Sequence, residues 1–106
     1  MLNLTPHAIA IILDSGETLT VPPSGTVARV TTHEEEIAPL GRISIIKRVL
    51  GKAEGLPEGT DQPILVSAMV LAAVPGRPNT YAPDTGPTAI RDEGGRIQAV
   101  TRLVAA

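Results

Sequence analysis

Residues 8–21 read AIAIILDSGETLTV, and this stretch decides the fold class. Its first six residues are apolar on both alternating faces, a pattern typical of a strand that is buried on both sides. An Asp-Ser-Gly turn follows, and residues 17–21 then alternate polar and apolar. We expect Leu19 and Val21 to face inward. The stretch therefore predicts a β-hairpin.

The next segments predict more strands. After a Pro-Pro-Ser-Gly turn, residues 26–32 alternate and are expected to add a third strand to a meander. Residues 33–36, His-Glu-Glu-Glu, break the alternation, and residues 39–41 are expected to close a loop. Residues 42–50 then form a longer strand, with Gly51 as the mark of a bulge.

The apolar stretch at residues 64–74 has two interpretations. In the first, residues 64–66 form a short buried strand and Ser67 caps a short helix over residues 68–74, which a Pro-Gly pair ends. In the second, residues 64–74 form one continuous element. Periodicity does not separate the two for so short a run.

The last third of the chain is expected to hold a loop and a hairpin. Residues 77–87, RPNTYAPDTGP, have neither helical nor strand periodicity and predict a long loop, which in a small domain is often functional. Residues 88–91 and 96–104 are expected to pair across a turn at residues 92–95.

Length and composition predict one small domain with a modest core. The 106 residues include ten Gly, ten Pro and no Phe, Trp or Cys, and Tyr81 is the only aromatic residue. An aliphatic core with many turns leaves little stability for a lone domain, so we expect a homo-oligomer. The predicted class is α+β and β-rich, a small twisted or barrel-like, mainly antiparallel sheet with one short helix.

Charge and hydropathy exclude two classes of partner. A net charge of −2 gives no basic surplus for the phosphates of a nucleic-acid polymer, and one aromatic residue makes no stacking platform. The longest apolar stretch has eleven residues, well short of the roughly 20 that a membrane span needs. The absence of cysteine fits a reducing compartment. Residues 1–7 have no basic region and Pro6 interrupts their apolar run, so we expect no signal peptide and a soluble, cytoplasmic protein.

Catalytic and metal motifs are missing from the sequence. It contains no Gly-x-Ser-x-Gly elbow, no phosphate loop and no Gly-x-Gly-x-x-Gly, so we expect no enzyme and no cofactor. His33 lies beside three glutamates, but adjacent acids without ligand spacing are typical of a solvated loop. We therefore expect no metal site.

The predicted loop at residues 77–87 contains the best candidates for a ligand site. Arg77 offers a planar fork for phosphate, and Tyr81 can stack on a base. The alternative is a prolyl connector that Tyr81 anchors over the sheet. Arg29 on the third strand either faces solvent or lines a pocket, and His7 either contacts a ligand or bonds backbone through its ring. The candidate set is Arg77, Tyr81, Asn79, Asp84, Thr85, Arg29 and His7.

Several motifs occur together in a particular order. They are NLTPH at residues 3–7, PPSG at residues 22–25, EGLP at residues 54–57 and YAPDTGP at residues 81–87. In these motifs the chain resembles a group of small uncharacterised proteins of bacteriophages and bacteria that open with NLTPH. The resemblance covers most of the chain and brings no activity with it. It implies a setting in which small proteins without enzyme motifs are often accessory or anti-defence factors.

Two functions follow as expectations. The first is a non-enzymatic protein that binds a small anionic, nucleotide-like ligand and sequesters it. Its site lies either within one subunit or at an interface between subunits. Some anti-defence factors bind and hold nucleotide-derived immune signals, and by that analogy of setting, not of sequence, such a signal is the ligand that we expect. The second is a structural or protein-binding accessory protein without a small-molecule ligand.

Overall fold

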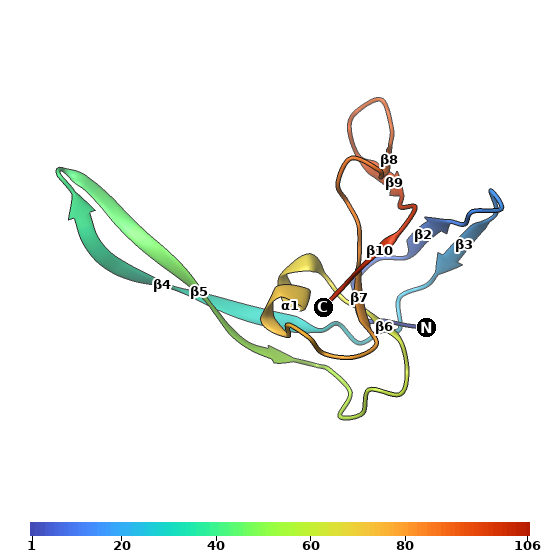
Figure 1. The fold of residues 1–106 in the computed structure, drawn as a ribbon, viewed down its shortest axis with the longest axis horizontal. Coiled ribbons are helices and arrows are strands. Elements are labelled where there is room, and N and C mark those ends of the chain that lie inside the picture. The colour runs from blue at the N-terminus through green and yellow to red at the C-terminus, as the bar shows by residue number, and fades with distance from the viewer.

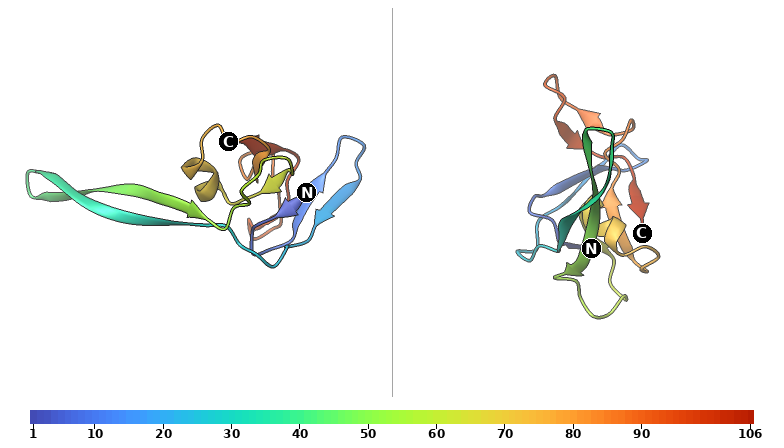
Figure 2. Two further views of the ribbon diagram at one scale, coloured as in Figure 1. Left: turned by 90° about the horizontal axis from the view of Figure 1, so that it is seen from below. Right: turned by 90° about the vertical axis from the view of Figure 1, so that its left-hand side faces the viewer.

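The computed structural model describes all 106 residues as a small body with one long arm (Figure 1). The molecule measures 55 × 39 × 23 Å along its principal axes, and the arm makes up much of the longest one (Figure 2). The elements in chain order are β1 (Leu2–Asn3), β2 (Ile9–Ile12), β3 (Thr18–Val21), β4 (Arg29–Leu40), β5 (Ile43–Glu54), β6 (Ile64–Leu65), α1 (Ala68–Ala73), β7 (Thr80–Pro83), β8 (Ile90–Arg91), β9 (Ile97–Ala99) and β10 (Leu103–Ala105).

The strands form one four-stranded sheet and three separate two-stranded sheets. The strand order of the larger sheet is β1-β6-β7-β10, with parallel pairs on both sides of β6 and an antiparallel pair between β7 and β10. The other pairs, β2–β3, β4–β5 and β8–β9, are antiparallel. The predicted β-rich class is confirmed. The sheets do not close into a barrel, so of the two forms that the prediction allowed, twisted or barrel-like, the barrel-like one does not occur.

The hairpin predicted at residues 8–21 is confirmed as β2 and β3, with Ile9 opposite Val21. Val21 is buried as expected, but Leu19 is 45% exposed. Val100 pairs with Ile11 on the edge of β2 that faces away from β3. It therefore covers Ile11 and leaves Leu19, on the neighbouring strand, in solvent.

The predicted meander is wrong at its third strand. β4 pairs with β5 alone, and together they form the arm (residues 29–54) that projects from the body in Figure 1. Residues 33–36 do not interrupt β4, because both faces of the arm meet water and glutamates there remain solvated. The strand continues through Leu40, and the turn falls at Gly41, whose φ of 61° suits glycine.

The bulge predicted at Gly51 is confirmed. Val30 pairs with Ala53 and Thr32 with Leu50, so Gly51 and its successor lie opposite the single residue Thr31. A Cβ atom at position 51 would lie 2.8 Å from Thr31 Oγ1 and 2.9 Å from its carbonyl oxygen. The close approach of the two strands here therefore requires glycine.

The stretch at residues 64–74 follows the first of its two interpretations. β6 is short and fully buried, and Ser67 caps α1 by accepting a hydrogen bond from the Val70 amide at 3.3 Å. The helix has only six residues, and no helix of this chain has the length and apolar character needed to cross a membrane.

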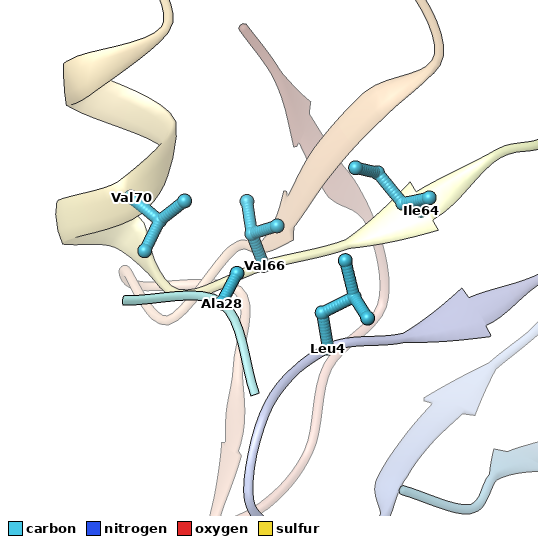
Figure 3. Close-up of a cluster of buried hydrophobic side chains, with 5 residues drawn as sticks. All are labelled: Leu4, Ala28, Ile64, Val66 and Val70. Carbon is cyan, nitrogen blue, oxygen red and sulfur yellow. The ribbon is translucent and has the colours of Figure 1, made fainter. Parts of the chain in front are cut away.

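The core is aliphatic and consists of two clusters on opposite sides of β6. Successive side chains of a strand point to opposite faces, so Ile64 and Val66 enter one cluster and Leu65 enters the other. Figure 3 shows the first cluster, which joins the N-terminal segment, the base of the arm and α1. Its members are Leu4, Ala28, Ile64, Val66 and Val70, and those of the second cluster are Ile11, Val21, Leu65 and Val100.

The loop predicted at residues 77–87 is wrong in its middle. Residues 80–83 form β7, which lies between β6 and β10 in the larger sheet. Thr80 and Ala82 are buried, whereas the polar and proline residues around them had suggested a loop. The Thr80 hydroxyl tolerates burial because it donates to the Pro78 carbonyl and accepts a hydrogen bond from Arg77.

The C-terminal hairpin is confirmed only in part. β8 and β9 pair across the predicted turn, but residues 96–104 do not form one strand. β9 ends at Ala99, and after a short connection β10 joins the larger sheet beside β7. The C-terminal residues therefore complete the body rather than lengthen the hairpin.

Candidate functional site

The NLTPH motif forms a buried hydrogen-bond network around Asn3. The Asn3 side-chain amide donates to the carbonyls of Val21 at 3.0 Å and His7 at 2.9 Å. Its side-chain oxygen accepts from both the amide and the hydroxyl of Thr5. The motif thus joins β1 to the end of β3. His7 is exposed and its ring makes no hydrogen bond. The ring therefore does not bond the backbone, and no neighbouring side chain holds it in a ligand site.

Arg77 connects the segment between α1 and β7 to the loop at residues 57–60. Its guanidinium donates to Thr80 Oγ1 at 2.7 Å, to the Pro57 carbonyl at 2.8 Å and to the Gly59 carbonyl at 3.2 Å. Asn79 makes a parallel connection, since its side-chain amide donates to the Thr60 carbonyl at 2.7 Å. The fork predicted to bind phosphate therefore already binds carbonyl groups of the chain itself.

Tyr81 is a strand residue rather than part of an exposed loop. It lies on β7, and its backbone carbonyl accepts a hydrogen bond from the Val66 amide at 2.8 Å. The side chain is half-buried and packs against the second core cluster. This packing matches the anchoring role that was the alternative to base stacking.

Asp84 and Thr85 take part in contacts at the C-terminal end of the body. The Asp84 carboxylate accepts from the Arg102 guanidinium and from the Gly86 amide, and these two donors hold its pKa below the usual 3.8. The Thr85 carbonyl accepts from the Arg91 guanidinium at 2.9 Å. The Asp84 and Asn79 side chains are thus engaged in separate internal contacts, whereas Thr85 is held by its backbone carbonyl and its side chain is exposed.

Arg29 differs from the other candidates, because its guanidinium makes no hydrogen bond or ion pair within the chain. It is exposed at the base of β4 and lines a groove of about 380 Å³ between the arm and α1. We name this hollow the Arg29 groove. Its lining residues are Leu4, Thr5, Pro6, Val27, Ala28, Arg29, Val30, Thr31, Ser67, Met69 and Val70.

The groove combines an apolar floor with polar groups at its rim. Leu4, Ala28 and Val70 belong to the first core cluster and are fixed by packing. Exposed hydroxyl groups come from Thr31 on β4 and from Ser67 at the start of α1. A rigid apolar base with a few convergent polar groups is the usual composition of a small-molecule site, and the volume lies in the usual range.

A second hollow of about 420 Å³ lies on another side of Leu4. It is formed by the N-terminal segment, the PPSG turn and the EGLP loop, and it carries no charged side chain. Its lining residues are Leu2, Leu4, Ser24, Thr26, Gly55, Leu56 and Pro57. This hollow has nothing to neutralise an anion, so it is the weaker candidate.

The acidic segment of the arm shows only pairwise contacts. His33 Nε2 lies 3.3 Å from Glu35 Oε1, and Glu34 lies 4.0 Å from Arg48, both at exposed positions. The structure brings no three His, Cys, Asp or Glu side chains together in a cluster that could hold a metal ion.

Comparison of the chain with protein-family models, with curated proteins and with solved structures finds no match.

Sequence reasoning included Arg29 but ranked it behind Arg77 and Tyr81. The signal for the groove was present in the alternation of residues 26–32, which places Arg29 at a strand position beside apolar neighbours. The contribution of α1 to the opposite wall had no such signal, because the contact between β4 and the helix is a feature of the tertiary structure alone.

Proposed function

We propose that this chain is a non-enzymatic binding protein that holds a small anionic, nucleotide-like ligand in the Arg29 groove. The observation that carries the proposal is the unpaired guanidinium of Arg29 at a groove with an apolar floor. An arginine fork binds phosphate in a bidentate manner, and a guanidinium that makes no hydrogen bond or ion pair gives up none when it does so.

The other groups of the groove fit the less charged parts of such a ligand. The Thr31 and Ser67 hydroxyls can donate to or accept from ribose hydroxyls, and the exposed Met69 side chain offers a flexible apolar surface to a base. The site has no aromatic residue for stacking. Base identity would therefore depend on shape and on hydroxyl contacts.

Sequestration is the mode of action that we propose for this binding. A bound nucleotide-derived signal would be withdrawn from its receptor without chemistry, by analogy of setting with anti-defence factors that hold such signals. A second candidate, a structural or protein-binding accessory protein, is favoured by a different observation, namely the exposed apolar residues of the arm.

Calorimetric titration tests the proposal with a panel of cyclic, linear and ADP-ribose-type nucleotides. Wild type should bind at least one member, and Arg29→Ala should weaken that binding by about 1.5–3 kcal/mol, the usual contribution of hydrogen bonds to a charged group. Arg96→Ala is the matched control, because Arg96 is exposed on the C-terminal hairpin, outside the groove. Equal binding by wild type and Arg29→Ala would remove the site from the groove.

A further inference from the structure

The arm leaves the chain far less compact than its size requires. The radius of gyration is 16.6 Å, whereas a compact domain of this length has one of about 13 Å. The accessible surface is 7286 Å², whereas a compact monomer of 11.0 kDa exposes about 5,600 Å². The chain thus exposes roughly 1,700 Å² more than a folded monomer of its mass needs to.

No residue of the arm is buried, although many of its side chains are apolar. A two-stranded hairpin by itself is at best marginally stable in water, and neither strand of the arm has a second neighbour in a sheet. Side chains on one face of such a hairpin normally contribute to stability only when another surface covers them. Val30 and Ala53 at the base of the arm pack against the first core cluster, but the arm beyond its base lacks such a cover.

The register of the arm collects four large aliphatic side chains on one face near its tip. Ile37 lies opposite Ile45, and Leu40 lies opposite Ile43. Cross-strand partners share a face of the arm. Ile43 and Ile45 are two apart on β5 and also share a face, so both pairs lie on the same face. Leu40 is 66% exposed, Ile43 62% and Ile37 49%. We name these four residues, Ile37, Leu40, Ile43 and Ile45, the tip face.

The charges next to the tip face are self-complementary. Glu35 lies opposite Lys47, one step along the same face toward the body. In a two-fold contact that lays β4 of one arm over β5 of the other, each Glu35 meets the partner's Lys47. The same operation places Ile37 over the partner's Ile45 and Leu40 over the partner's Ile43.

We propose that the tip face is the contact through which two copies of this chain associate, arm on arm. A second copy fits as the occupant because the tip face is apolar and the charges beside it, Glu35 and Lys47, are self-complementary across a two-fold axis. The projecting arm, which contributes to the excess surface of the chain, offers further area for an interface beyond the four tip residues. A lipid surface fits less well, since Glu34, Glu35 and Glu36 precede the tip face and anionic headgroups repel them.

Sedimentation velocity over a concentration series tests the apolar part of the contact. Wild type should be dimeric or larger at micromolar concentration, and Ile43→Ser should raise the dissociation constant roughly 30-fold or more, as loss of an interface hot spot does. Ile46→Ser is the matched control, because Ile46 lies on the opposite face of the arm and is 42% exposed. A monomeric wild type, or equal weakening by both variants, would overturn the proposal, as would a monomer that binds lipid vesicles through its arm.

A charge-swap experiment tests the two-fold pairing separately. Glu35→Lys places two lysines on this step of the face, and Lys47→Glu places two glutamates there, so each variant alone should associate more weakly than wild type. Mixed in equal amounts, the two variants should form a heterodimer, because every contact between them is then of opposite sign. Failure of the mixture to associate better than either variant alone would refute the arrangement.

Discussion

Replacing Arg77 by alanine is expected to destabilise the protein even when no ligand is present. The substitution removes three hydrogen bonds, to Thr80 Oγ1 and to the carbonyls of Pro57 and Gly59. These bonds connect the start of β7 to a loop that has no regular secondary structure of its own. The loop and the start of β7, an inner strand of the larger sheet, should therefore loosen together.

The magnitude follows from the kind and the exposure of these bonds. Each hydrogen bond from a charged donor contributes about 1.5–3 kcal/mol. None of the three bonds is fully buried, so water replaces them in part in the variant, and we expect a total loss of about 2 kcal/mol. For a domain of this size such a loss lowers the Tm by roughly 8–16 °C. The stability of Arg77→Lys should lie between those of wild type and Arg77→Ala, because an ammonium group can donate hydrogen bonds but cannot reproduce the planar fork.

Urea unfolding followed by far-ultraviolet circular dichroism measures this effect. Protein concentration must be equal in all samples, since self-association adds to apparent stability. Arg96→Ala is the control and should change the free energy of unfolding by less than about 0.5 kcal/mol, as surface substitutions usually do. An Arg77→Ala protein as stable as wild type would refute the structural role of these hydrogen bonds, and Arg77 would again be a candidate for ligand binding.

Two further predictions concern the arm base and the C-terminal contacts. Gly51→Ala should destabilise the protein by about 1–3 kcal/mol through overpacking against the facing strand, whereas Gly59→Ala, with open space around it, should cost little; urea midpoints compare them. The folded-state pKa of Asp84 is lowered by Arg102, so the stability it contributes is full above about pH 3.8 and is lost as the pH falls through the lowered value. The difference in unfolding free energy between wild type and Asp84→Asn should therefore shrink in acid, and a difference that is constant with pH would contradict this.

Local signals predicted the local parts of the fold. The turn at residues 14–16, the cap at Ser67 and the bulge at Gly51 each depend on a few neighbouring residues, and the structure contains all three. The β4–β5 pairing was missed because glutamates were expected only outside strands. A strand with both faces in water obeys no alternation, so the periodicity of residues 33–36 carried no information.

The candidate site was only partly predictable for a related reason. An arginine in a sequence shows its chemistry but not its partners, so Arg77 and Arg29 were equally able to bind phosphate. Only the tertiary structure shows that the Arg77 guanidinium binds the carbonyls of Pro57 and Gly59, whereas the Arg29 guanidinium has no such partner. Likewise, the strand β7 depends on its neighbours β6 and β10, which are distant in sequence.

Native mass spectrometry of the purified protein, incubated with the nucleotide panel, is the most direct test of the central claim. We expect an assembly of two or more 11.0 kDa chains that retains a phosphate-bearing nucleotide, and an Arg29→Ala assembly of the same size without it. An assembly that retains no member of the panel, or an Arg29→Ala assembly that retains the nucleotide as wild type does, would contradict ligand binding in the Arg29 groove.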